Sequence, residues 1–264
     1  MDFGGLFVAS IELSNICNKR CWMCQRHRDG FFKKDENYGE MDLELVKKIA
    51  NQLPSGIIVQ FHNSGEPLLY SKFKEAIDLF DRQIKAVDTN GKLLVEKASL
   101  IIDTLDTITI STFQDDPEWE EQYEQIIEFL KIKGDRKPNV IIRVLGDIGE
   151  HRKKLYQNTG CLLVNRVLHS SAGSFEYKKT PCIPEWGFCQ ELISHLVIDV
   201  DGWVSLCIRY DKDGDLRIGN ANTQSLIDIW NSDKRKYYIQ EHIKGNRNLP
   251  ICSKCEYYGI PRGD

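Results

Sequence analysis

Residues 6–24 read LFVASIELSNICNKRCWMC, an apolar run typical of a β-strand followed at once by a loop with three cysteines. Cys17, Cys21 and Cys24 crowd together in that loop, where thiolates at such density are ligands for zinc or for an iron–sulfur cluster. A structural zinc takes four ligands, and His27 is the nearest fourth candidate. The residues alone therefore predict a metal centre after the first strand and leave both kinds of centre open.

Beyond this loop, strand-like apolar runs alternate with amphipathic helical stretches as far as about residue 170. The expected strands are 6–13, 56–61, 84–91 with its loop, 106–112, 139–145 and 161–168, and the expected helices are 42–53, 72–80, 93–105, 117–133 and 151–158. This alternation predicts an α/β fold with a parallel sheet and outer helices, either open and doubly wound or a partial barrel. In both folds, function lies on the loops at the strands' carboxyl ends.

The pattern changes past about residue 175. Residues 195–207, HLVIDVDGWVSLC, alternate with period two around Asp201 and Gly202, which predicts a hairpin, and a single helix is expected over 225–243. We therefore expect two domains, 1–175 and 176–264. Four cysteines lie around the second one, and by spacing alone a four-thiolate zinc site there stays open: Cys189, Cys207, Cys252 and Cys255.

Composition narrows the partners and the compartment. The chain has 264 residues, 41% of them hydrophobic, and a net charge of −4 with acids and bases interspersed, which argues against nucleic acid and anionic membranes as partners. It has no membrane-spanning run and no secretory N-terminus, so we expect a cytoplasmic protein that binds a small molecule or a peptide. Nine cysteines in that compartment favour metal binding over disulfides.

The spacing of Cys17, Cys21 and Cys24 resembles the CxxxCxxC signature of the radical S-adenosylmethionine (SAM) superfamily. The resemblance implies that these three cysteines hold a [4Fe–4S] cluster whose open iron is chelated by SAM. It also implies cleavage of SAM to a 5′-deoxyadenosyl radical, which abstracts hydrogen from a substrate carbon. Family members usually carry an aromatic residue before the last cysteine, and Met23 stands there in this chain, where it can pack against adenine.

Three further segments resemble SAM-binding elements of that superfamily, each at the end of an expected strand. Residues 64–67 (SGEP) resemble the segment that meets the SAM amino group, and residues 88–91 (DTNG) resemble its TNG element. Ser111 and Arg143 stand where members contact the SAM ribose and carboxylate. The resemblance covers roughly residues 6–170 and implies a partial (β/α)6 barrel, with these SAM contacts: Met23, Ser64, Gly65, Glu66, Pro67, Asn90, Ser111 and Arg143.

The C-terminal part resembles the SPASM/twitch accessory domains of the same superfamily. The resemblance lies in residues 197–232 (VIDVDGWVSLCIRYDKDGDLRIGNANTQSLIDIWNS) and in residues 251–255 (ICSKC). It implies a small α+β domain that binds one auxiliary [4Fe–4S] cluster in the shortened, twitch form. The implied ligands are Cys189, Cys207, Cys252 and Cys255.

These resemblances imply an oxidoreductase supplied with electrons by an external donor such as flavodoxin or ferredoxin. The expected reaction is two-electron oxidation of an alcohol on a sugar or aminocyclitol, with the auxiliary cluster accepting the second electron. Two alternatives stay open: peptide epimerisation or cross-linking, in which Cys182 would return a hydrogen atom, and a non-catalytic zinc-binding adaptor.

Two details of the site stay open as well. Alcohol-oxidising members use an arginine near the end of the barrel domain, but residues 168–177 (LHSSAGSFEY) contain none. Arg143, His169 or Glu176 then substitutes for it, or the substrate differs. We expect Cys161, at the head of a strand, to be a buried small hydrophobe. Three roles stay open for Cys182: an inert linker thiol, a hydrogen-atom donor to a substrate radical, or a cluster ligand in place of Cys189.

Overall fold

The computed structural model describes residues 2–24, 26, 38–166, 168, 188–208, 211, 214–246, 249 and 251–255. Six strands that follow one another along the chain pair in parallel with their sequence neighbours. They are β1 (Val8–Ile11), β2 (Ile58–Phe61), β3 (Ile84–Thr89), β4 (Thr107–Phe113), β5 (Asn139–Leu145) and β6 (Leu162–Arg166). The predicted parallel sheet is therefore confirmed, strand by strand.

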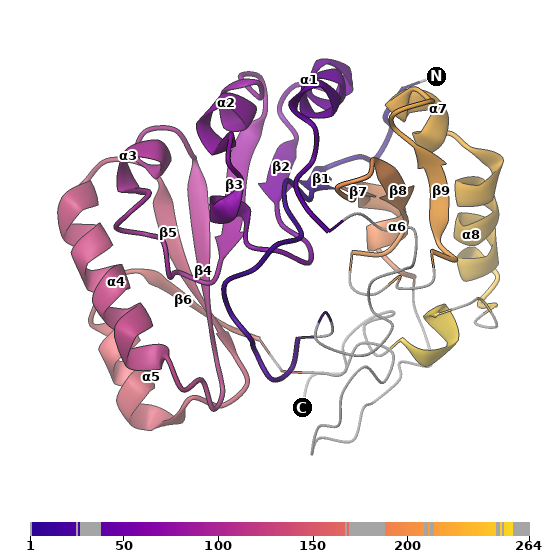
Figure 1. Cartoon of the computed structure of the whole chain (residues 1–264). Helices are drawn as coiled ribbons and strands as arrows, with labels where there is room; N and C mark the ends of the chain where they lie inside the picture. The colour runs from indigo at the N-terminus through magenta and orange to yellow at the C-terminus, as the bar shows by residue number, and fades with distance from the viewer. Residues whose placement is uncertain are drawn as a thin grey trace.

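Five helices form an outer layer around this curved sheet (Figure 1). They are α1 (Leu43–Gln52), α2 (Phe73–Asp78), α3 (Ala98–Ile101), α4 (Trp119–Lys133) and α5 (Gly149–Gln157). The core lies between helices and sheet because alternate strand residues point to opposite faces. Val59 and Phe61, for example, are fully buried in that core. Gln60 and His62, by alternation, face the inner side of the sheet.

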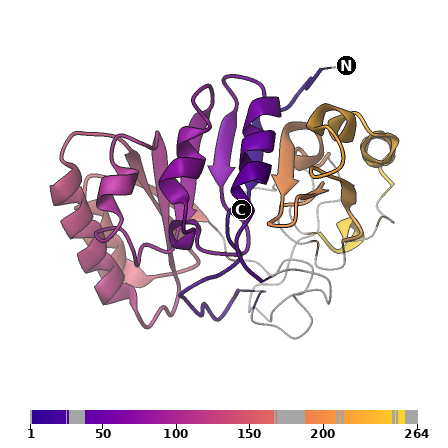
Figure 2. The same ribbon diagram turned by 45° about the horizontal axis from the view of Figure 1, so that its top comes forward.

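The C-terminal elements continue the same sheet, whose order is β6-β5-β4-β3-β2-β1-β7-β8-β9. Strand β7 (His195–Ile198) pairs in parallel with β1, and β8 (Trp203–Ser205) returns antiparallel to it before β9 (Arg217–Asn220). Gly202 has a φ of 79° in the connecting turn, which explains the glycine there. The predicted hairpin is confirmed, and it stands at the β1 end of the barrel sheet, in orange in Figures 1 and 2.

Two predicted helices are wrong in extent. The stretch 93–105 is helical only over α3, because turns precede it and Asp103, with a φ of 61°, follows in a left-handed conformation. The stretch 225–243 is two helices, α7 (Leu226–Trp230) and α8 (Asp233–Ile243). Ser232 separates them because its side chain caps α8 by accepting from the Arg235 amide.

Short elements complete the described chain: the 3₁₀ turns η2 (Pro67–Leu69) and η4 (Cys252–Lys254) and the single-turn helix α6 (Glu191–Ser194). None of the helices in the described ranges is long and apolar enough to cross a bilayer.

Candidate functional site

The loops after β1 and β2 pack directly against each other. A Cβ added to Gly65 would lie 1.9 Å from the Ser14 carbonyl oxygen, so only glycine allows this approach of backbone to backbone. The Glu66 amide donates to the Ile16 carbonyl at 2.8 Å, and the Ser64 amide donates to the Glu12 carboxylate at 2.7 Å. The SGEP segment is therefore fastened to the start of the cysteine loop.

Glu66 joins the second strand end to the third. Its buried carboxylate accepts from the Leu68 amide at 3.1 Å, from the Thr89 hydroxyl at 2.8 Å and from the Asn90 amide at 2.7 Å. Burial raises the pKa of Glu66 to about 7, although these hydrogen bonds act in the opposite direction. Both carboxylate oxygens of Glu66 thus accept hydrogen bonds from the protein's own loops. The predicted contact with the SAM amino group would come in addition to these three hydrogen bonds.

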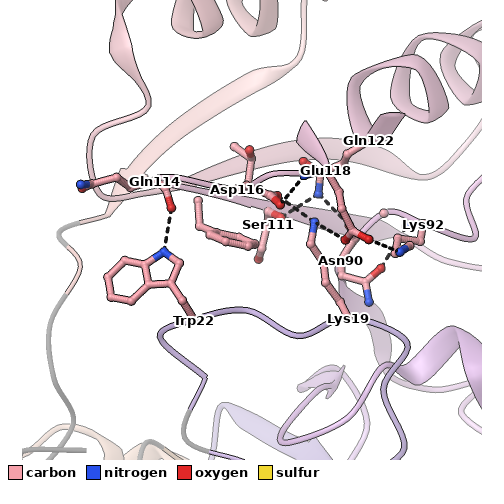
Figure 3. Close-up of polar contacts among 12 residues, drawn as sticks. Lys19, Trp22, Asn90, Lys92, Ser111, Gln114, Asp116, Glu118 and Gln122 are labelled. Carbon is pink, nitrogen blue, oxygen red and sulfur yellow. Dashed lines mark hydrogen bonds and ion pairs between the residues drawn. The ribbon is translucent and has the colours of Figure 1, made fainter. Parts of the chain in front are cut away.

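Asn90 joins the third strand end to the cysteine loop. Its side-chain amide donates to the Asn18 side chain at 2.8 Å and lies 3.8 Å from the Cys17 sulfur. Its carbonyl and that of Ser111 both accept from the Gln122 side chain of α4, at 2.6 and 2.9 Å (Figure 3). Asn90 is therefore placed at the first of the three thiols.

The segment between the cysteines is held by the loop after β4. Lys19 makes a 2.7 Å ion pair with Asp116, and the two side chains expose only 2% and 0% of their surface. The ammonium of Lys19 also lies 5.0 Å from the centre of the Phe113 ring, and the Trp22 indole N–H donates to the Gln114 carbonyl at 2.9 Å (Figure 3). The cysteine loop is thus held from the β3 side and from the β4 side.

Cys17, Cys21 and Cys24 are half-buried free thiols that share one electrostatic site. Burial raises the pKa of Cys21 to about 12, Cys24 and Cys17 add to this rise, and Lys19 opposes it. Within the described ranges, no three His, Cys, Asp or Glu side chains are close enough for a single metal ion. Thiolates that bind an iron–sulfur cluster give up their protons on binding, and three neighbouring cysteine thiols are ligands of the right chemistry for such a cluster.

The second thiol set comes from three separate elements. Cys189 precedes α6, Cys207 follows β8, and Cys252 and Cys255 lie at the two ends of η4. Burial raises the pKa of Cys252 to about 12, and Cys207, Cys189 and Cys255 each contribute to the rise, so each of these three thiols lies within electrostatic range of Cys252. Their convergence fits a four-thiolate centre.

The remaining candidates are placed less centrally. Met23 is half-buried beside Cys24, and Pro67 is buried as the first residue of η2. Ser111 of β4 is in register with Arg143 of β5, whose guanidinium is turned to Asp88. Cys161 is half-buried and packs against the core, close to the prediction for it. Cys182, His169 and Glu176 lie outside the described residues.

Sequence reasoning missed the polar residues that face the inner side of the sheet, chiefly Glu12, His62 and Asp88. A signal exists for Glu12 and His62, because polar residues alternate with apolar ones over residues 9–14 and 59–62, whereas Asp88 follows no such alternation in β3. The ion pair that joins the cysteine loop to the loop after β4, Lys19 with Asp116, carries no such signal, since the two residues are far apart in the sequence.

A curved parallel sheet with three thiols after its first strand, joined to a unit with four more, defines an iron–sulfur enzyme of the SAM-activating kind. The chain belongs to the radical SAM superfamily, whose profile matches residues 11–159. The iron–sulfur cluster-binding SPASM domain matches residues 189–256. SAM and a [4Fe–4S] cluster are therefore its cofactors, with further iron–sulfur binding in the SPASM part.

Known relatives agree with this assignment. The S-adenosyl-L-methionine-dependent 2-deoxy-scyllo-inosamine dehydrogenase of Niallia circulans is 25% identical, over 96% of this chain and 94% of its own. The crystal structure of BtrN with AdoMet and 2-DOIA superposes with a TM-score of 0.64 at 21% identity, covering 95% of this chain and 93% of that one. Native anSMEcpe with bound AdoMet gives 0.64 at 16% identity, over 89% and 83%. The likeness to these two structures shows the shared fold.

Proposed function

We propose that this enzyme is a dehydrogenase that oxidises an alcohol carbon of a small polyhydroxylated substrate, a sugar or an aminocyclitol. The observation that carries the proposal is the convergence of Cys189, Cys207, Cys252 and Cys255. Four thiols can ligate all irons of one auxiliary cluster, which suits that cluster to electron transfer rather than to substrate chelation. In the barrel, Cys17, Cys21 and Cys24 would hold the cluster that leaves one iron for SAM.

The chemistry divides between the two sites. Bound at the cysteine loop, SAM and its cluster supply a 5′-deoxyadenosyl radical. With these groups bound, the substrate would give up a hydrogen atom from carbon, a proton from the hydroxyl to a base of the protein, and one electron that a cluster held by Cys189, Cys207, Cys252 and Cys255 could accept, which leaves a ketone. Cleavage of each SAM would consume one electron from an external donor such as flavodoxin or ferredoxin. The reduced auxiliary cluster would pass one electron back to that donor.

The full-length similarity to an alcohol-oxidising relative supports this reaction. As expected from the sequence, residues 1–175 would generate the radical and residues 176–264 would accept the electron. The close packing of the SGEP, DTNG and cysteine segments supports their joint role in holding SAM.

The test removes the auxiliary ligands by replacing Cys189, Cys207, Cys252 and Cys255 together with alanine. With 2-deoxy-scyllo-inosamine and a panel of sugars and aminocyclitols as probes, 5′-deoxyadenosine and ketone are measured in the same reaction. We expect the variant to keep SAM cleavage and to lose at least about tenfold in ketone formed per 5′-deoxyadenosine. Unchanged coupling would refute the electron-accepting role, and a wild type that oxidises no probe would refute the alcohol substrate. Replacing Cys161 with alanine is the matched control.

A further inference from the structure

The inner face of the sheet carries a polar cluster one layer below the SAM-binding loops. It consists of His62 at the end of β2, Asp88 on β3 and Arg143 on β5. His62 and Asp88 each precede a proposed SAM contact, Ser64 and Asn90, by two residues. A strand rises about 3.3 Å per residue, so the cluster lies roughly 7 Å along the strands from that level. A substrate whose carbon faces SAM would reach it.

The three side chains share one carboxylate. Arg143 Nη1 donates to Asp88 Oδ2 at 2.5 Å, and His62 Nδ1 lies 3.8 Å from the same oxygen. The other oxygen, Asp88 Oδ1, is buried and has no partner at hydrogen-bond geometry among the described residues, although the neighbouring Gln60 side chain also lowers the pKa of Asp88. Asp88 thus keeps one buried oxygen that the described residues leave unsatisfied, beside the oxygen that Arg143 and His62 approach.

His62 differs from the other histidine on this face. His195 uses both ring nitrogens, at 2.7 Å from the Ser10 hydroxyl and at 2.7 Å from the Glu191 carboxylate. The His62 ring makes no hydrogen bond within the described part of the chain, and its side chain is 34% exposed toward the inner side. It is therefore accessible to a ligand, whereas His195 is occupied by the protein.

The surroundings of His62 lower its pKa overall. Burial lowers its pKa from the usual 6.5, Asp88 raises it in part, and Arg143, Arg166 and His195 lower it further. Burial would raise the pKa of Asp88, but His62 and Arg143 lower it overall, so the carboxylate is charged. On the β1 side, the Glu12 carboxylate accepts hydrogen bonds from the amides of Ser64 and Val200. At neutral pH, His62 is thus a neutral imidazole beside an anion.

We propose that His62 accepts the proton of the hydroxyl that is oxidised, and that Asp88, positioned by Arg143, stabilises the imidazolium that results. This inference rests on the proposed dehydrogenation, in which the proton from oxygen must go to a base of the protein. The O–H bond breaks, an N–H bond forms on His62, and the electron goes to the auxiliary cluster as above.

The test compares wild type with His62→Gln and Asp88→Asn, using 2-deoxy-scyllo-inosamine and the same probe panel. His151→Gln, on the exposed surface of α5, is the matched control. Iron content and SAM binding establish that each variant is folded. We expect His62→Gln to keep SAM cleavage within about twofold and to lose roughly 10²-fold or more in ketone formation at pH 7, since that is the usual contribution of a general base.

A pH profile gives a second measurement. In wild type, ketone formation should fall below a pKa under 6.5 as His62 becomes protonated, and this acidic limb should be absent from the residual activity of His62→Gln. Full ketone formation by His62→Gln, or an unchanged acidic limb in that variant, overturns the role of His62 alone. A wild type that cleaves SAM but oxidises no probe overturns the dehydrogenation, and the role of His62 with it.

Discussion

The buried ion pair between Lys19 and Asp116 should decide whether the cysteine loop keeps its shape. Replacing Lys19 with Met keeps the length of the side chain and removes its charge, so Asp116 stays buried without its cation. Breaking such a pair costs about 3–5 kcal/mol. For a chain of this size, about 1 kcal/mol moves Tm by roughly 2–4 °C, so we expect a Tm lower by roughly 6–20 °C.

Lys92→Met is the matched control, because its 2.7 Å pair with Glu118 is partly exposed, at 30% and 37%, and is worth at most about 1 kcal/mol. The double variant Lys19→Met/Asp116→Leu should recover most of the loss, since replacing both partners of a buried pair by apolar groups is often neutral. The assays are the Tm of the iron-loaded protein under anaerobic conditions and its iron content after a fixed reconstitution. A Lys19→Met variant as stable as Lys92→Met, with full iron, would refute the reasoning.

Three further predictions concern SAM and the product. Glu66→Gln and Asn90→Ala should each weaken SAM binding by roughly ten- to a hundredfold, about 1–3 kcal/mol, with the clusters intact. The first variant turns a side-chain NH₂ group toward the Asn90 amide, and the second removes the hydrogen bond to Asn18. Unchanged SAM dissociation constants in titrations would show that these loops do not bind SAM. Gly65→Ala should destabilise the protein by about 1–3 kcal/mol or more and weaken SAM binding, because the added Cβ collides with the Ser14 backbone. Gly39→Ala should change neither stability nor SAM binding, because a Cβ there meets nothing within 4 Å. Equal Tm values for the two variants would contradict the close packing at Gly65. In deuterium oxide, a dehydrogenase should return no solvent hydrogen to the reacting carbon, because that carbon becomes a carbonyl, and Cys182→Ala should keep most activity; a product with one deuterium at the reacting carbon, together with loss of turnover in that variant, would favour epimerisation instead.

The sequence predicts the strands of this fold better than its helices. Apolar runs such as 139–145 coincide with β5 because a buried strand needs little besides its own pattern. The break between α7 and α8 depends on a single capping serine, Ser232, inside a continuous helical pattern. Ser232 is a recognisable N-cap residue in the sequence. A single capping residue is a weaker signal than a helical pattern that continues on both sides of it, so the pattern predicts one helix.

The site divides in the same way. The cysteines and the SGEP and DTNG segments follow strand ends and could be found from short motifs. The Lys19 to Asp116 pair and the sharing of Asp88 by His62 and Arg143 join residues from different strands and loops. Such pairs depend on strand order and register, which period and spacing do not specify.

The most direct test of the account is the iron content of the anaerobically reconstituted protein, measured together with SAM cleavage. Seven candidate ligands in sets of three and four predict about eight irons in two [4Fe–4S] clusters. Replacing Cys17, Cys21 and Cys24 with alanine should leave about four irons and abolish 5′-deoxyadenosine formation. Retention of SAM cleavage by that variant, or stoichiometric zinc without iron in the wild type, would contradict the account.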